Sequence, residues 1–240
     1  MNEMNNSPKL YLVPSPLGEN PLNEVLPTII YSRIEHISHF AVEEVRTARR
    51  FLSRLGFKGR IDSLKFYTIN EHSSDADIEA AFAPLAAGND MALISEAGLP
   101  AVADPGALLV AKAHRNDIEV VPFVGPSSLM MALMASGMNG QSFAFAGYIP
   151  VKRDERKKRV RELESRSAHQ DETEILIETP YRNDSLFADI LEVCNSATRV
   201  CVAVNITMPD QFIKTKTVAQ WRKFDLKIDK RPCVFLIYAR

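Results

Sequence analysis

The chain has 240 residues, of which 46% are hydrophobic and 25% are charged. These proportions are ordinary for a folded globular protein, and the length allows one large domain or two small ones. Because 29 basic residues nearly balance 30 acidic ones, the net charge excludes a protein that binds nucleic acid through overall charge alone.

The first half of the chain alternates between strand-like and helix-like segments. Short apolar runs with β-branched or aromatic residues predict strands at 9–13, 37–42, 64–69, 91–95 and 118–123. Amphipathic segments predict helices at 22–33, 43–56, 75–88 and 106–116. This alternation is typical of an α/β protein.

The second half continues the alternation less regularly. Helices are expected at 126–137, 154–166 and 183–195, and strands at 142–149, 173–178, 199–206 and 233–239, with a turn and a segment at 217–224 before the last strand. The last strands have little helix between them, so we expect this end of the sheet to be antiparallel. We expect two α/β domains, covering residues 1–122 and 123–240.

The three cysteines, Cys194, Cys201 and Cys233, are widely spaced and form no CxxC pair. That spacing favours neither a disulfide framework nor a zinc site. The polar N-terminus predicts no signal peptide, and the most apolar helical stretch is shorter than the roughly 20 residues that span a bilayer. We therefore expect a soluble, cytoplasmic protein.

Four loops rich in Gly, Pro and hydroxyl residues follow predicted strands, at 14–21, 95–106, 124–128 and 178–182. Ligands of open α/β sheets bind at the carboxyl ends of the strands, so these loops are candidate binding loops. For 14–21 alone a plain turn is the simpler explanation. The stretch 95–106, SEAGLPAVADPG, holds more backbone-shaping residues than a turn needs and favours a ligand site.

Several common site motifs are absent from the sequence. There is no GxGxxG after the first strand and no GxxxxGK[ST], HExxH or GxSxG. Ordinary dinucleotide binding, P-loop nucleotide hydrolysis and the corresponding protease and hydrolase chemistries are therefore poorly supported. The five histidines are scattered, and no metal site is expected.

The chain resembles the tetrapyrrole-methylase-like methyltransferases that use S-adenosylmethionine. The resemblance rests on seven blocks in order: LYLVPSPLGEN, AVEEVRTARRFL, NEHS, ALISEAGLPAVADPG, VVPFVGPSSLMMALMASG, FAGYIPVKRDERKKR and ILIETPYR. Within that family the chain looks most like the branch that methylates a cytidine ribose 2′-hydroxyl of small-subunit ribosomal RNA. The resemblance implies a two-domain α/β fold, a homodimer, and S-adenosylmethionine bound between the domains.

The resemblance also implies residues for the cofactor. Those expected to bind S-adenosylmethionine are Pro16, Gly98, Leu99, Pro100, Val102, Asp104, Pro126, Ser127, Ser128, Thr179, Ile206, Thr207 and Pro209. Backbone amides and carbonyls of Gly- and Pro-shaped loops could satisfy such a ligand without a charged clamp. Asp104 has an equal alternative role, because Asp is a preferred residue at a helix N-terminus.

The acid–acid–x–Arg motif of the resembled branch falls on Glu43, Glu44 and Arg46, and a second substrate motif falls on Glu71 and His72. A solvated helix face with ion pairs is the other explanation for the first motif. A ribose hydroxyl must lose a proton, and Glu43, Glu44, Glu71 and His72 are all candidate acceptors. The sequence does not choose among them.

Residues 151–161 carry seven basic side chains against two acidic ones, which could contact RNA phosphates or only form a solvated helix face. The expected function is methylation of a ribose 2′-hydroxyl in small-subunit ribosomal RNA. Two alternatives stay open: a methylase of a tetrapyrrole or corrin precursor, because 205–211 resembles corrin-type relatives, and a non-catalytic relative that binds the cofactor or RNA.

Overall fold

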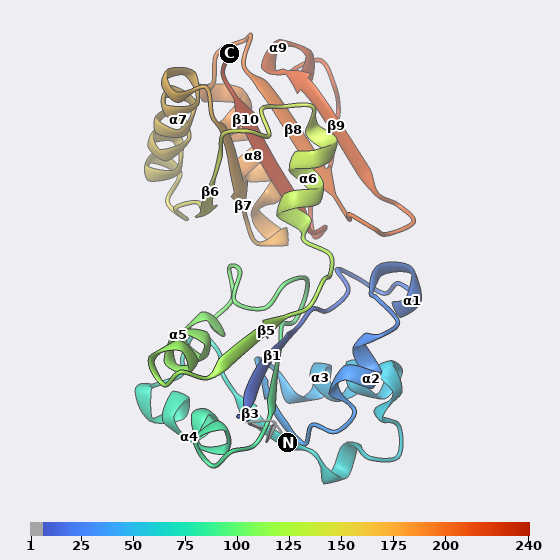
Figure 1. Ribbon diagram of the computed structural model, residues 1–240. Coiled ribbons are helices and arrows are strands. Elements are labelled where there is room, and N and C mark those ends of the chain that lie inside the picture. Colours follow the sequence, from blue (N-terminus) through green and yellow to red (C-terminus); the bar gives the residue numbers. More distant parts are fainter. Residues whose placement is uncertain (1–6) are drawn as a thin grey trace. The chain divides into compact units, whose positions relative to one another are not determined.

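The computed structural model describes residues 7–240 (Figure 1). The chain divides into two compact units, Met1–Ser127 and Ser128–Arg240, each with its own five-stranded sheet. The boundary expected after residue 122 falls at the end of the last strand of unit 1. Within residues 7–240, no helix is both long and apolar enough to cross a membrane.

Unit 1 contains a parallel sheet with strand order β3-β2-β4-β1-β5. Its strands are β1 (Lys9–Val13), β2 (His39–Val42), β3 (Lys65–Thr68), β4 (Met91–Ile94) and β5 (Glu119–Pro122). Because every pair is parallel, the loops that follow the strands leave from one edge of the sheet. The central position of β4 places its following loop between those of β2 and β1.

Helices cover both faces of this sheet. They are α1 (Leu22–Val25), α2 (Ile30–Ile34), α3 (Val45–Leu52), α4 (Asp75–Ala86) and α5 (Ala107–Arg115), with a π-helical segment at Ser53–Phe57 and a 3-10 turn at Ile61–Ser63. Phe40 belongs to the hydrophobic cluster on the face covered by α1–α3, whereas the next residue, Ala41, belongs to the cluster on the face covered by α4 and α5. All four residues of β4 are buried, as expected for a strand covered on both faces.

The single helix expected at 22–33 is two short helices. Leu26 adopts an extended conformation, with φ −124° and ψ 143°, immediately before Pro27. The proline ring disfavours a helical conformation in the preceding residue, which ends α1 at Val25. The prediction of one continuous helix was therefore wrong, and Pro27 is the residue in the sequence that accounts for the break.

Unit 2 contains a mixed sheet with strand order β6-β7-β10-β8-β9. The strands are β6 (Phe143–Tyr148), β7 (Thr173–Ile177), β8 (Arg199–Val204), β9 (Phe212–Thr217) and β10 (Cys233–Tyr238). Only β6 and β7 pair in parallel, and the other three pairs are antiparallel. The expected antiparallel arrangement at the end of the chain is confirmed, but β9 had not been predicted.

The helices of unit 2 are α6 (Ser128–Ser136), α7 (Arg153–Gln170), α8 (Asn183–Val193) and α9 (Val218–Trp221), with a 3-10 turn at Pro180–Arg182. Helices α7 and α8 pack on one side of the sheet around Phe187, Trp221 and Phe235. The Trp221 indole N–H donates to the Val200 carbonyl at 2.8 Å, which satisfies the one polar group of this buried ring.

Candidate functional site

Three of the candidate loops meet at the carboxyl edge of the unit 1 sheet. Ser15 and Gly98 exchange two backbone hydrogen bonds, of 2.9 and 3.1 Å, so the loops after β1 and β4 are joined. A Cβ at Gly125 would lie 2.2 Å from Pro14, so the loop after β5 packs directly on the first loop. The parallel order of β4, β1 and β5 explains this meeting.

The loop after β4 has an unusual backbone. Gly98 has φ +77°, and Ala101 and Ala103, which carry side chains, have φ +64° and +55°. Left-handed conformations of non-glycine residues are uncommon and cost energy, so they often occur at ligand sites. Pro100 is buried, and Val102 is 47% exposed.

Asp104 holds this loop in shape. Its Oδ1 accepts hydrogen bonds from the backbone N–H of Ala101 at 3.1 Å and of Gly106 at 2.7 Å. Helix α5 begins at Ala107, so Asp104 stabilises the turn that leads into the helix. The same carboxyl group is also hydrogen-bonded to the side chain of Glu43.

Glu43 follows β2 and lies in a cluster of three carboxyl groups with Glu96 and Asp104. Burial, together with the hydrogen bond to Asp104 and the charges of Asp104 and Glu96, raises the pKa of Glu43 to about 7. The backbone N–H of Glu96 donates to the Glu43 carboxyl. Glu43 therefore changes protonation near neutral pH, which is the property of a useful general base.

Glu44 and Glu96 have different partners. The Glu44 side chain accepts from the Arg46 N–H at 2.8 Å and forms the N-terminal cap of α3. The Glu96 carboxylate accepts from the Thr47 hydroxyl and the Glu44 N–H, while burial raises its pKa. The two adjacent acids thus differ in their contacts: the Glu43 carboxyl faces Asp104, whereas the Glu44 carboxyl caps α3, although its charge also contributes to the raised pKa of Glu96.

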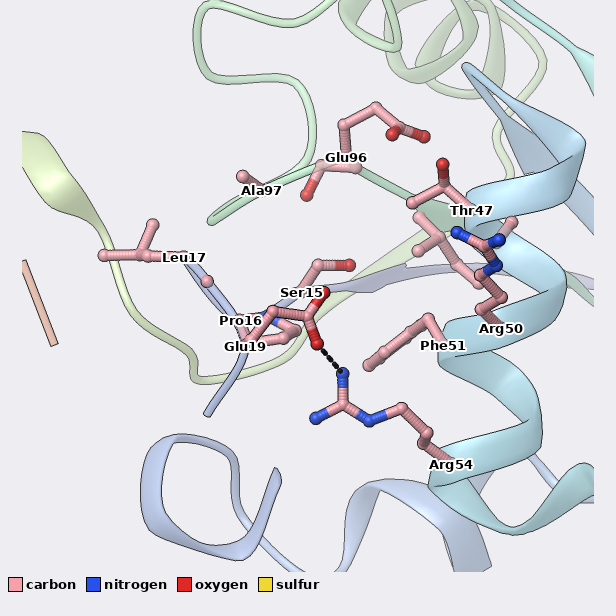
Figure 2. A pocket seen from close by; sticks show the side chains of 14 residues that line it. Ser15, Pro16, Leu17, Glu19, Thr47, Arg50, Phe51, Arg54, Glu96 and Ala97 are labelled. Atoms are coloured by element: carbon pink, nitrogen blue, oxygen red, sulfur yellow. Dashed lines mark ion pairs between the residues drawn. The ribbon is translucent and has the colours of Figure 1, made fainter. Parts of the chain in front are cut away.

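A cavity of about 180 Å³ adjoins the acidic cluster (Figure 2). It lies between the loop after β1, helix α3 and the start of the loop after β4. The residues that line it are Ser15, Pro16, Leu17, Gly18, Glu19, Thr47, Ala48, Arg50, Phe51, Arg54, Ile94, Ser95, Glu96 and Ala97. Of these, only Pro16 belongs to the predicted site; Thr47, Arg50 and Arg54 were missed, although their spacing on one helix face could have signalled them.

The other two predicted substrate residues of unit 1 are exposed. The side chains of Glu71 and His72 are 85% and 84% exposed and are 3.5 Å from each other. Among residues 7–240, no hydrogen bond or ion pair joins either of them to Glu43. Arg49 of α3 donates to the Asp62 carboxylate at 2.5 Å.

The residues of unit 2 that are expected to bind the cofactor follow two strands that run in the same direction. Thr179 follows β7, and Ile206, Thr207 and Pro209 follow β8; both strands are antiparallel to β10, so their carboxyl ends share an edge. Segment 230–232 connects the loops, because the Lys230 N–H donates to Pro180 and the Asn205 N–H donates to Pro232. Ser128 is the first residue of α6 in this unit.

The loop after β8 repeats the backbone feature of the unit 1 loop. Asn205 and Thr207 have φ +48° and +74°, although neither is glycine. Ile206 between them is buried at 5% exposure, and Pro209 is exposed. Left-handed residues therefore occur in two of the loops that carry residues expected, from the family resemblance, to bind the cofactor.

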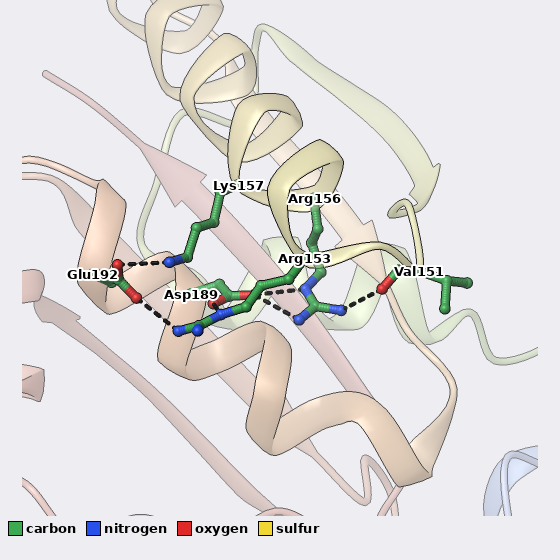
Figure 3. Close-up of polar contacts among 6 residues, drawn as sticks. All are labelled: Val151, Arg153, Arg156, Lys157, Asp189 and Glu192. Carbon is green, nitrogen blue, oxygen red and sulfur yellow. Dashed lines mark hydrogen bonds and ion pairs between the residues drawn. The ribbon is translucent and has the colours of Figure 1, made fainter.

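The basic segment 151–161 forms the first half of α7, and ion pairs occupy much of it (Figure 3). Arg156 is buried and binds Asp189 of α8 at 2.6 Å, while Arg153 and Lys157 bind Glu192 at 3.0 and 2.6 Å. These contacts fasten α7 to α8 and reduce the positive charge that is left unpaired on this segment. Lys158 and Arg161 stay exposed, with no ion pair found for either in the described part of the chain.

Comparisons with known proteins agree with the fold. The family model described as Tetrapyrrole (Corrin/Porphyrin) Methylases matches residues 34–221. The crystal structure of the methyltransferase CobJ superposes with a TM-score of 0.63, covering 97% of this chain and 94% of that one at 16% identity. A uroporphyrin-III-C-methyltransferase from Thermus thermophilus gives a TM-score of 0.55 at 16% identity, covering 96% and 94%.

Curated relatives are more similar in sequence. "Ribosomal RNA small subunit methyltransferase I" of Vibrio cholerae is 29% identical over 98% of this chain and 78% of its own length. The protein of the same name from Mesorhizobium japonicum is 32% identical over 88% of this chain and 68% of its own. With the family model matching more than half of its length, the chain belongs to the tetrapyrrole (corrin/porphyrin) methylase family and is a methyltransferase.

Proposed function

We propose that this protein transfers a methyl group from S-adenosylmethionine to a ribose 2′-hydroxyl of small-subunit ribosomal RNA. The observation that carries the proposal is the similarity, over most of the chain, to relatives named as small-subunit ribosomal RNA methyltransferases. Glu43, whose pKa is raised to about 7, supports a hydroxyl as the acceptor, because a hydroxyl must give up a proton when it is methylated.

The residues of unit 1 fit S-adenosylmethionine as methyl donor. Glu43, Glu96 and Asp104 place three carboxyl groups close together, and burial raises the pKa of both glutamates. A cationic ligand beside this cluster would offset the repulsion among the carboxylates. Left-handed residues beside Gly98 turn backbone amides and carbonyls out of regular pairing, which suits the polar groups of the cofactor.

In this proposal the loop at 98–104 holds the cofactor, which supplies an electrophilic methyl group on a sulfonium. Glu43 accepts the proton of the attacking 2′-hydroxyl at its carboxylate. The Glu96 backbone N–H orients the Glu43 carboxylate, and once protonated Glu43 can donate to Asp104, whose own position is fixed by two backbone N–H donors. Positioning accounts for most of the acceleration, because sulfonium is already a good leaving group.

The proposed function is tested by methyl transfer to ribosomal particles. Small ribosomal subunits that lack the modification are incubated with the protein and cofactor labelled in the methyl group. We expect label in RNA at a single nucleotide whose 3′ linkage resists alkaline hydrolysis, because a 2′-O-methyl group removes the attacking hydroxyl. Label in a base, or in a corrin or porphyrin precursor with none in RNA, would contradict the proposal.

We also propose that the protein is a cytoplasmic homodimer. All three cysteines are buried and free, which suits a reducing compartment. Large apolar side chains are exposed on unit 2: Met134 of α6 at 79%, and Phe143 and Phe145 of the edge strand β6 at 40% and 38%. Sedimentation velocity should show a dimer that Phe145→Asp dissociates, and a monomeric wild-type protein would refute the dimer.

A further inference from the structure

The cavity beside the acidic cluster is too small for the whole cofactor. Its volume is about 180 Å³, whereas sites for drug-sized ligands have about 300–1,000 Å³. Ala48 and Phe51 of α3, together with Ile94 at the end of β4, give it apolar walls. A single flat ring is the kind of group that fits such a space.

A buried hydroxyl in this cavity has no partner. Ser15 is 3% exposed, and its Oγ makes no hydrogen bond within residues 7–240. Its backbone is fixed by the two hydrogen bonds to Gly98, so the hydroxyl is held in place. Because a buried polar group without a partner costs free energy, this hydroxyl indicates a polar ligand.

The charges around the cavity indicate which polar ligand. The Arg54 guanidinium donates to the Asn20 carbonyl at 2.5 Å and forms an ion pair with Glu19 at 3.5 Å. Arg50 has no hydrogen bond or ion pair in the described part of the chain, and Glu96 presents a carboxylate on the opposite loop (Figure 2). Two arginines are thus balanced by two glutamates, which disfavours an anion such as phosphate and favours a neutral ring with both donors and acceptors.

We propose that this cavity binds the base of the nucleotide that is methylated, and that it selects a base with an exocyclic amino group. Glu96 accepts from the amino group, while Arg50 and Ser15 donate to the neighbouring ring nitrogen or carbonyl oxygen. The apolar walls contact the faces of the ring. The inference rests on the proposed function for the identity of the substrate as RNA, and it adds a site that reads the base.

The position of Glu96 connects base and ribose. Glu96 lines the cavity and also belongs to the cluster with Glu43. A nucleotide whose base fills the cavity therefore has its sugar near the carboxyl group proposed to take the proton. Enzymes that act on a nucleotide inside structured RNA can extrude it into a pocket that reads the base edge, and a pocket of this size suits one extruded base.

The test measures binding and does not depend on methyl transfer. Dissociation constants of cytidine, adenosine, guanosine and uridine 5′-monophosphates are determined by NMR titration of the whole protein. The wild type should bind at least one of the three amino-bearing nucleotides about tenfold more tightly than uridine monophosphate. Because an amide can donate to a carbonyl oxygen, Glu96→Gln should abolish or reverse that preference.

Glu24→Gln serves as the matched control, because Glu24 is exposed on α1 and does not line the cavity. It should retain the wild-type preference. Equal binding of all four nucleotides by the wild type, or an unchanged preference in Glu96→Gln, would overturn the inference. If the preference and its reversal are observed but ribosomal subunits receive no label, the base site stands and the proposed function fails.

Discussion

Glu43→Gln should lower kcat/KM for methyl transfer by about 10²–10⁴-fold, because it removes the proposed proton acceptor while keeping the size of the side chain. The structure favours Glu43 over its neighbour because Glu43 lies in the acidic cluster with a pKa of about 7, whereas Glu44 caps α3. Steady-state kinetics with undermethylated small subunits measure the effect.

Glu44→Gln is the natural comparison, because glutamine can still accept the hydrogen bond from the Arg46 N–H. We expect this variant to lose less than about tenfold in kcat/KM, since only a partial loss of helix capping is involved. If Glu44→Gln were the more damaging substitution, the assignment of the proton acceptor would be wrong.

The same carboxyl group predicts a pH dependence. Log kcat/KM of the wild type should rise with unit slope up to about pH 7 and then level off, because kcat/KM reports ionisations of the free enzyme. The residual activity of Glu43→Gln should lack this limb. A wild-type profile that is flat between about pH 6 and 8, about one unit either side of the raised pKa, would speak against Glu43.

Whereas kcat/KM should rise with pH, the stability of the folded protein should fall. The folded protein binds more protons at Glu43 than the unfolded chain between the ordinary pKa of 4.5 and the raised value of about 7, so stability falls as pH rises through this window. Above pH 7, Glu43→Gln should therefore be more stable than the wild type by about 1–2 kcal/mol, a figure lowered for solvent screening of a partly exposed group. Urea denaturation at pH 5 and pH 8 compares the two proteins.

The second large effect is expected at Gly98, where Gly98→Val should weaken S-adenosylmethionine binding by at least about 100-fold. Gly98 has φ +77°, and a Cβ there would meet Leu17 at 3.3 Å and the Pro126 carbonyl at 3.4 Å. A β-branched residue is strained in that conformation, so the loop must move away from its present path. Titration calorimetry with the cofactor measures the loss.

Gly88→Val is the control that distinguishes the effect of backbone strain on stability from an effect on cofactor binding. Gly88 has φ +85°, lies in the same unit and has open space around its would-be Cβ. Both variants should lose about 1–3 kcal/mol of stability, but Gly88→Val should keep the wild-type affinity for the cofactor. If the two variants bind the cofactor equally well, the loop after β4 does not hold it.

The elements that could be predicted from the sequence are those that depend on a local pattern of residues. The apolar run at 91–95 and the glycines and prolines after it identify β4 and its loop, because burial on both faces and turn chemistry are visible within a few residues. The strand β9 was missed because its alternation of Ile, Lys and Thr follows a turn and is weakly apolar. As an edge strand it needs little burial to pair with β8.

The site depends on contacts that local pattern does not contain. Glu43 and Asp104 are far apart in the sequence, and they meet because β2 and β4 are neighbours in the sheet. Likewise, the basic run in α7 did not reveal that Arg156 is buried against Asp189. Composition could suggest which residue types matter, but the strand order decides which of them lie together.

The two backbone hydrogen bonds between Ser15 and Gly98 also link the binding of the base to the binding of the methyl donor. One partner contributes a side chain to the inferred base cavity, and the other lies in the loop proposed to hold the methyl donor. A shift of either loop is thus transmitted to the other through hydrogen bonds instead of through solvent. By thermodynamic reciprocity, any increase in donor affinity caused by a bound base equals the increase in base affinity caused by the donor.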